Sequence, residues 1–575
     1  MKRSLITFGI LFSLCLSMGL FTACSTEEEQ AQPQQNLVNL AAKGKIILSM
    51  QDFNAEREIT RAVQAPTDTQ VVDLDNGMTA EISVERGRKR KTAATRASDI
   101  LNGHFNLYAL NPITNQRVGN LLKGTVKTTY TWISTPTPGF PWGHQEDTTT
   151  FTADAGSELE LPSGTFTPDA GLSLMLAPGT YKFVCYNDAV EDNGTNLTIK
   201  NSVDNPLIGS TTATIPANSI EYKVDIEMKH PAVQCLVSLK NLIGDGEPTA
   251  GFVNMKGRLT ATTTKAIQYS ADLTSKTVIP GTDILEFSFG HSYYPDKNNI
   301  YLYVLPGDGI DMKLEFYNGT CYYKSVGTLK TSLAKLGTMS ANDNYKLNIK
   351  INPSYEYLFN NGTTGYLRDK GMRTPIGIVV RRKTAGKKGL AVALNLASTS
   401  QVRAFTDTYI SGVGFVYYTN KRAFPNLTDA FTDMDGYAYT WDANTSSNNE
   451  VKAGSDKYPA FKLAANYNPG VPTSGIGKWF LPSLGQIKLM MATIGFSRKS
   501  MSNEDMQSWA SAALDYGFSK AAASNPPVVT ADKSFEAICS STCAQNQYFW
   551  LYWANYVNGF YRTDSSGYVL PFVEF

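Results

Sequence analysis

The chain has 575 residues, with 52 lysines and arginines against 51 aspartates and glutamates, so its formal net charge at pH 7 is +1. This balance gives no electrostatic reason to expect a nucleic-acid partner or a strongly acidic ligand. Charged residues make up only 18% of the chain while tyrosine and glycine are plentiful, which favours an exported, mainly β protein. Four scattered histidines without H-E-x-x-H or paired-cysteine spacing predict no metal site, and we expect no cofactor.

Residues 1–23 are expected to form a signal peptide. Lys2 and Arg3 precede an almost uncharged stretch, and three glutamates rather than a basic stop follow it, so cleavage is a better interpretation than a membrane span. The sequence L-F-T-A-C, which ends at Cys24, resembles the lipobox of bacterial lipoproteins. That resemblance implies lipidation of Cys24, for example with palmitate. The alternative is an ordinary signal peptide with a chance cysteine.

Residues 24–40 have no pattern that could bury a face, so they are predicted to be a polar tether. Two or more acyl chains on Cys24 would give a durable anchor. The acidic triplet behind Cys24 resembles the export signal that sends some lipoproteins across the outer membrane. We therefore expect a protein anchored by lipid in the cell outer membrane and exposed at the surface.

Residues 41–215 and 216–352 are predicted to form two β-sandwich domains in tandem. A strand is expected over 45–53, and two later runs alternate apolar with polar residues, as half-buried antiparallel strands do. The predicted buried faces carry Ile220, Tyr222, Val224, Ile226 and Met228 in one run and Tyr345, Leu347, Ile349 and Ile351 in the other.

Two further segments echo each other. Residues 174–186 and 302–317 are each predicted to be an apolar strand, a Pro-Gly turn and a second strand. With the lipobox, an early strand followed by T-R-A, an L-Y-A-L-N-P strand and a closing Tyr-x-Leu-x-Ile strand, they make the chain resemble the fimbrillins of type V pili. The resemblance implies transthyretin-like, Greek-key sandwiches and assembly with other pilus subunits by strand exchange.

A basic run covers residues 86–98, with six cations and no interleaved aromatic residues. Without such aromatics a nucleic-acid interface is not indicated, and one interpretation is a solvated loop. In fimbrillins an arginine-specific protease removes the N-terminal strand and with it the lipid anchor. The resemblance implies that Arg61 or Arg96, each followed by alanine, is the processing site.

The last 200 residues or so predict a different fold. After a linker at 353–372, paired strands and a helix with a capping box, Ser483 and Gln486, indicate an α+β domain over 373–575, with a second helix at 503–516. W-F-L-P-S before a helix and the ending V-L-P-F-V-E-F resemble a C-terminal domain of fimbrillin-like lipoproteins that is related to C-type lectins. The calcium motifs of true C-type lectins are not present in the sequence.

The densest aromatic stretch of the sequence is Y-F-W-L-Y-W, beginning at residue 548. Aromatic rings stack on sugars and anchor protein interfaces, so this stretch is a candidate ligand-binding site. The alternative is that both faces of the strand are packed in the core. The candidate residues are Tyr548, Trp550, Tyr552 and Trp553.

No enzyme motif is found: there is no G-x-S-x-G, and G-I-G-K-W lacks the spacing of a phosphate loop. The resemblance to fimbrillins implies a pilus accessory or tip subunit and adhesin, with a host or bacterial glycan or protein as its receptor. A pilus anchor that keeps its lipid, and a free-standing surface lipoprotein that binds a glycan or peptide, are the alternatives. Cys539 and Cys543 are close enough in sequence to pair or to remain free thiols.

Overall fold

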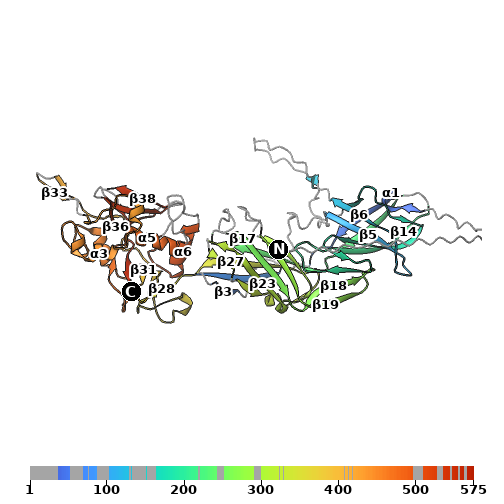
Figure 1. Ribbon diagram of the computed structural model, residues 1–575, viewed down its shortest axis with the longest axis horizontal. Coiled ribbons are helices and arrows are strands. Elements are labelled where there is room, and N and C mark those ends of the chain that lie inside the picture. The colour runs from blue at the N-terminus through green and yellow to red at the C-terminus, as the bar shows by residue number, and fades with distance from the viewer. Residues whose placement is uncertain are drawn as a thin grey trace, which may run out of the picture.

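A computed structural model shows three units in a row along the longest axis of the molecule, from blue and green at one end to orange and red at the other (Figure 1). The fold is mainly β. The structure describes residues 37–51, 53, 69–74, 77–86, 103–127, 131–132, 150–151, 164–217, 221–242, 252–289, 299–322, 324–327, 329–406, 408–411, 414–416, 419–495, 509–527, 535–543, 547–553, 557–562 and 566–575.

A curled seven-stranded sheet forms the first unit. Its strands are β2 (Gly44–Met50), β5 (Gly103–Leu110), β6 (Arg117–Lys127), β9 (Gly164–Pro168), β11 (Gly179–Asn187), β14 (Ile208–Ile215) and β15 (Tyr222–Met228). Their order is β14-β11-β5-β6-β9-β2-β15, and only β2 and β15 run parallel. Ile208 and Lys229 exchange backbone hydrogen bonds of 3.2 and 2.7 Å, so the two edges meet there and the sheet resembles a barrel.

Short elements complete the first unit. The chain enters through β1 (Val38–Asn39), which pairs with β10 (Met175–Leu176), and a single helical turn, α1 (Leu40–Lys43), leads into β2. A parallel pair, β7 (Thr131–Trp132) and β8 (Thr150–Phe151), lies apart from the main sheet. The core holds apolar side chains from every main strand, including Leu48, Leu107, Leu122, Phe166, Phe183, Ile215 and Ile226.

Two sheets packed face to face form the second unit. One has the order β21-β16-β27-β4-β3, and the other has the order β20-β17-β23-β24 with β25 beside β23. The first sheet consists of β3 (Gln70–Leu74), β4 (Met78–Arg86), β16 (Val233–Lys240), β21 (Asn299–Val304) and β27 (Asn344–Pro353). The second consists of β17 (Phe252–Ala261), β20 (Asp283–Ser288), β23 (Met312–Cys321), β24 (Lys324–Ser325) and β25 (Lys330–Ser332). A small ribbon, β22 (Gly307–Asp308) with β26 (Thr338–Met339), joins them.

The first two units share a four-stranded sheet. β12 (Glu191–Asp192) and β13 (Asn196–Ile199) follow the strands of the first unit, whereas β18 (Thr264–Ser270) and β19 (Lys276–Pro280) belong to the second. The order is β12-β13-β18-β19, and β13 pairs with β18 along its whole length. Backbone hydrogen bonds therefore join the two units, in addition to side-chain packing.

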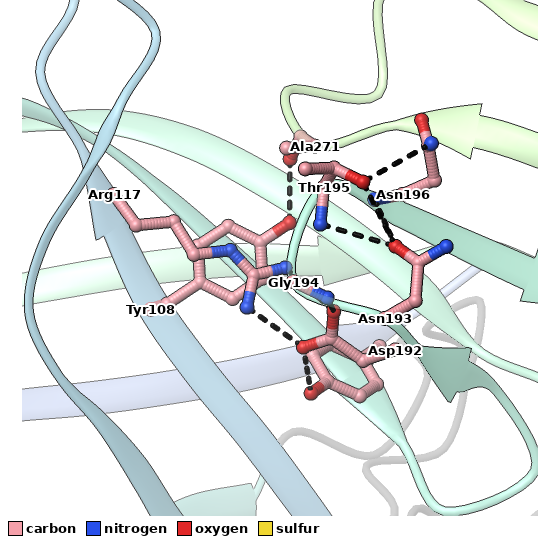
Figure 2. Close-up of polar contacts among 9 residues, drawn as sticks. Tyr108, Arg117, Asp192, Asn193, Gly194, Thr195, Asn196 and Ala271 are labelled. Atoms are coloured by element: carbon pink, nitrogen blue, oxygen red, sulfur yellow. Dashed lines mark hydrogen bonds and ion pairs between the residues drawn. The ribbon is translucent and has the colours of Figure 1, made fainter.

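A polar cluster reinforces this joint (Figure 2). Arg117 binds Asp192 with two hydrogen bonds of 2.8 and 2.7 Å, and its guanidinium carbon lies 3.8 Å from the ring centroid of Tyr108. The Tyr186 hydroxyl donates to the same carboxylate at 2.6 Å, and the Tyr108 hydroxyl donates across the joint to the Ala271 carbonyl at 2.5 Å. The cluster ties strands of the first unit to a turn of the second.

A six-stranded sheet organises the third unit, in the order β29-β28-β30-β31-β40-β35. Its strands are β28 (Tyr357–Phe359), β29 (Thr364–Gly365), β30 (Pro375–Arg381), β31 (Leu390–Ala393), β35 (Trp479–Phe480) and β40 (Phe572–Glu574). The helices are α2 (Leu427–Ala430), α3 (Gly436–Trp441), α4 (Pro459–Ala465), α5 (Leu484–Thr493) and α6 (Trp509–Lys520). The remaining strands are β32 (Val402–Arg403), β33 (Thr408–Ile410), β34 (Gly414–Val416), β36 (Phe535–Cys543), β37 (Gln547–Trp553), β38 (Val557–Arg562) and β39 (Ser566–Gly567).

Strand pairing modifies the predicted division of the chain. β3 and β4 fall within 41–215 but pair in the sheet of the second unit, and β15 falls within 216–352 but pairs in the first. The predicted linker, 353–372, carries β28 and β29 and is part of the third unit, because Tyr355, Tyr357, Leu358 and Phe359 of Y-E-Y-L-F are buried. The Pro-Gly segments are not hairpins, since β10 and β11 on either side of the first turn lie in different sheets, and so do β21 and β23 around the second.

The alternating patterns are confirmed as strands with one buried face. Val224, Ile226 and Met228 in β15 are buried, and so are alternate residues of β27. The predicted pair of strands near the start of the third unit is β30 with β31. The predicted helix at 503–516 is described from Trp509 and continues to Lys520. Among the described residues, no helix is long and apolar enough to cross a membrane.

Candidate functional site

The position of β2 is the most unusual feature of the first unit. β2 is the first long strand of the chain, yet it lies between two strands that come much later, β9 and β15. With β15 it pairs in register over all seven residues, from Gly44 beside Tyr222 to Met50 beside Met228. Among the described residues, β2 pairs with β9 at Ile47 and Leu48. β15 thus holds β2 along its whole length.

The inner face of β2 supplies part of the core of the first unit. Ile46, Leu48 and Met50 point into the unit and are at most 5% exposed, while Lys45 on the other face is exposed. Each buried side chain of this size contributes about 2 kcal/mol relative to exposure to water. Without a strand at this position, the apolar floor made by neighbours such as Val224 would face solvent.

The start of β2 allows only a small residue. A Cβ at Gly44 would lie 2.8 Å from the Leu40 carbonyl oxygen and 3.0 Å from the Tyr222 ring. The Tyr222 hydroxyl is buried and has no hydrogen-bond partner in the described structure, and burial raises the pKa of Tyr222 to about 12. This end of the β2 position is closely packed by an aromatic ring.

The other end of β2 is held by a histidine that follows β15. His230 is 2% exposed, and its Nε2 lies 2.9 Å from the Gln51 carbonyl oxygen. Its Nδ1 lies 3.1 Å from Asn205 Oδ1, and the Phe53 ring stacks on the imidazole at 3.7 Å. His230 is one of the four scattered histidines for which the sequence predicts no metal site. The available signal was its place directly after an alternating strand.

The predicted lipidation and processing residues, Cys24, Arg61 and Arg96, lie outside the described residues. The aromatic candidates lie on β37, the middle strand of the sheet β36-β37-β38. On β36, the backbone partners are Thr542 for Tyr548, Ile538 for Trp550, Glu536 for Tyr552 and Phe535 for Trp553. The structure therefore brings these four residues together on one strand, apart from the β2 position.

The W-F-L-P-S motif has a structural role. Trp479 is 6% exposed, and its carbonyl accepts a hydrogen bond from the Trp441 indole at 2.9 Å. Ser483 is the N-cap residue of α5, and its backbone N–H donates to Gln486 Oε1 at 2.9 Å, as one half of a capping box does. The Ser483 hydroxyl donates to the Asp433 carbonyl at 2.7 Å. The motif therefore joins β35, α5 and a central loop.

A buried lysine lies in the same unit. Lys452 is 1% exposed, and its Nζ donates to Asn420 Oδ1 at 2.8 Å and to the Tyr439 carbonyl at 3.2 Å. The rings of Tyr458 and Phe461 lie 5.5 and 5.2 Å from Nζ. Burial lowers the pKa of Lys452 to about 7, because no water solvates the ammonium form there.

The described cysteines form no disulfide. Cys539 and Cys543, the pair whose state the sequence left open, are both buried and not joined by a disulfide, and the same holds for Cys185, Cys235 and Cys321. Burial raises the pKa of the Cys539 thiol well above its ordinary value, so this thiol is a poor nucleophile. The described ranges contain no group of histidine, cysteine, aspartate or glutamate that could hold a metal ion.

No family model and no curated protein matches the sequence. Among solved structures, a fimbrial protein of Bacteroides ovatus matches over 94% of this chain and 100% of its own length, at 11% identity and a TM-score of 0.26. A fimbrial assembly protein of Parabacteroides distasonis matches over 49% and 92%, at 10% identity and 0.25. A Bacteroides uniformis protein provisionally assigned to cell adhesion matches over 44% and 92%, at 15% identity and 0.28. At these identities the similarity concerns the fold alone.

Proposed function

We propose that this chain is an accessory subunit of a pilus, that a strand of a neighbouring subunit replaces β2, and that the third unit is an adhesin. The observation that supports strand replacement is the position of β2. It is an early segment of the sequence that fills the core of a unit built from later strands, and it pairs in register with β15 over its whole length. In such strand addition, main-chain hydrogen bonds give affinity and alternate side chains fill pockets.

Arg61 is the processing site we favour over Arg96. Between the two arginines the chain forms β3 and β4, which pair in the second unit, where Met78, Ala80 and Ile82 are at most 2% exposed. Cleavage after Arg61 would free β2 and leave that sheet covalently intact. Cleavage after Arg96 alone would leave β2 joined to β4, so β2 could leave only if β4 were pulled from a packed sandwich.

The last strand supports a place at the tip of a fibre. β40 lies between β31 and β35, and Phe572 and Val573 are buried in the sheet. Donating this strand to a neighbour would break pairs on both sides and open the third unit. We therefore propose a subunit that accepts a strand but does not donate β40, and we assign it to the tip of a fibre.

The third unit would then be the part that meets a receptor, a host or bacterial glycan or protein. The sequence pattern on β37 supports this proposal, since Tyr548, Trp550, Tyr552 and Trp553 are residue types that bind sugars and protein partners. Before cleavage, a lipid on Cys24 would hold the precursor in the outer membrane. A subunit that kept this lipid would instead act as a pilus anchor or as a free-standing binding lipoprotein.

Strand replacement can be tested with the full chain carrying one engineered protease site after residue 61. A labelled peptide of residues 37–53 is added before and after cleavage, and its incorporation is measured by size-exclusion chromatography. We expect stable incorporation only after cleavage, because the covalent β2 outcompetes a peptide in trans. If the cleaved chain unfolds at once or never takes up the peptide, the proposed strand exchange is contradicted.

A further inference from the structure

The far end of the β2 position differs chemically from the rest of it. Along β2 the inward contacts are apolar, from Ile46 to Met50, whereas just beyond Met50 the strand meets a buried imidazole. Because the partner of His230 Nε2 is a carbonyl oxygen, that nitrogen must carry a proton and donate it. Asn205 fixes the other side of the ring at 3.1 Å, so the donor is held in one orientation.

Three features of the strand are held at this same end. The Gln51 N–H donates to the Met228 carbonyl at 2.8 Å and continues the ladder with β15. The Gln51 carbonyl accepts from His230, and the Phe53 ring lies almost parallel to the imidazole, with an interplanar angle of 23°. A main-chain donor, a main-chain acceptor and an aromatic ring are therefore held within three residues.

After cleavage at Arg61, Asn205 and His230 belong to the part of the chain that stays, whereas Gln51 and Phe53 belong to the part that leaves. We infer that Asn205 and His230 form a terminal subsite that recognises the end of an incoming strand. The ligand is a strand of another pilus subunit that places a free carbonyl where Gln51 has one and an aromatic ring two residues later. This inference rests on the proposed strand exchange and names what that exchange selects.

The apolar pockets along β2 and the polar end at His230 differ in chemistry. This difference explains why the His230 end would discriminate between incoming strands. Apolar pockets such as that of Leu48 tolerate other apolar side chains of similar volume, so they discriminate weakly. A buried donor that loses its acceptor is costly, and so is an imidazole face that loses its stacked ring. A strand that ends before position 51 would leave His230 without both of these contacts, and a strand that lacks the ring would leave it without the stacked one.

A double-mutant cycle tests the subsite. Peptides of residues 44–53 with phenylalanine, tyrosine or alanine at position 53 are titrated into the full chain cleaved after residue 61, with either His230 or the His230→Ala substitution. We expect replacement of Phe53 by alanine to weaken binding by about tenfold and tyrosine to preserve it. In His230→Ala the peptides should bind equally. A penalty for alanine that stays the same in His230→Ala would overturn the subsite.

A second measurement in the uncleaved chain separates failure of the subsite from failure of strand exchange. Hydrogen–deuterium exchange of residues 44–50 is compared in the native chain and in Phe53→Ala, Phe53→Tyr and His230→Ala. We expect faster exchange of β2 in the two alanine variants only, with unchanged exchange in β30 and β31 of the third unit. If no peptide binds to the cleaved chain, the proposed strand exchange is contradicted. If the hydrogen–deuterium exchange of β2 is equal in all four proteins, the subsite is contradicted.

Discussion

Burial of the Lys452 amine makes the stability of the third unit depend on pH. This amine lies among aromatic rings with only neutral hydrogen-bond acceptors, Asn420 Oδ1 and the Tyr439 carbonyl. In the unfolded chain the amine has its ordinary pKa, and in the folded chain burial lowers the pKa to about 7. Between these two values the unfolded state binds one more proton, so stability must rise with pH.

We predict that the Lys452→Met substitution abolishes this pH dependence. The native third unit should gain up to about 1.4 kcal/mol of unfolding free energy per pH unit above pH 7, and the variant should lack this gain. Denaturant unfolding followed by the fluorescence of Trp441 and Trp479 at pH 7, 8 and 9 measures the slope. Lys462→Met, at a side chain 41% exposed in α4, is the matched control and should keep it. A slope that survives in Lys452→Met would contradict the burial argument.

Arg117 controls the joint between the first two units. The burial of Asp192 alone would raise the pKa of its carboxyl, but hydrogen bonds from Arg117, Tyr186 and the Gly194 N–H outweigh this and lower the pKa. Since the folded pKa is depressed, this contribution to stability is present above the ordinary pKa of the carboxyl and is lost as pH falls through the folded value. The cluster should therefore loosen in acid.

We predict that Arg117→Ala destabilises the first unit by about 1–3 kcal/mol, because it leaves a half-buried carboxylate without its bidentate partner. Lys200→Ala is the matched control. Lys200 pairs with Glu191, the neighbour of Asp192 on β12. Both of these side chains are well exposed, so the loss of unfolding free energy should be below about 1 kcal/mol. Denaturant unfolding of both variants provides the comparison. Equal losses would show that the Arg117 cluster does not hold the joint.

At the scale of elements, β2 is the strand that we propose is replaced by a strand of a neighbouring subunit. Its inward and outward residues differ sharply: Leu48 is fully buried, and Ile47 is only partly buried. We predict that Leu48→Lys expels β2, since an unpaired charge cannot stay in the apolar core, whereas Ile47→Lys is tolerated. Exchange of the β2 amides in the full chain, followed by mass spectrometry, measures this. Similar protection of β2 in both variants would contradict its assigned orientation.

The terminal strand allows a second test at this scale. Because β40 pairs on both sides, removal of residues 572–575 should unfold the third unit and leave the first two folded. Limited proteolysis with mass spectrometry would show a resistant core that ends near residue 352. If the third unit remained protected, β40 would be dispensable and could be donated to a neighbour.

Sequence patterns predicted individual elements better than their partners. The alternation in Val224, Ile226 and Met228 identifies a strand because one buried face requires a period of two. It cannot identify β2, about 180 residues earlier, as the parallel neighbour of that strand. The same limit explains why the pairing of β3 and β4 in the second unit was missed. Burial of His230 and Lys452 was also not predictable, since their partners come from distant segments.

At the scale of the whole molecule, the three units differ in how they are joined. The first two share a sheet and a polar cluster, so we expect them to move as one body. The second and third share a continuous apolar core that includes Leu347 of β27 and Ala513 of α6. A strand accepted at the first unit would thus hold the third at the far end of a stiff rod, which suits an adhesin.

The most direct test is the N-terminus of the protein on intact cells, read by mass spectrometry of surface-released material. We predict a chain that begins at Ala62, with residues 37–53 absent and β3 and β4 retained. A chain that begins at Ala97 would contradict the choice of Arg61. A chain that begins at a lipid-modified Cys24 would contradict strand replacement, and would leave an anchor or a free-standing binding lipoprotein.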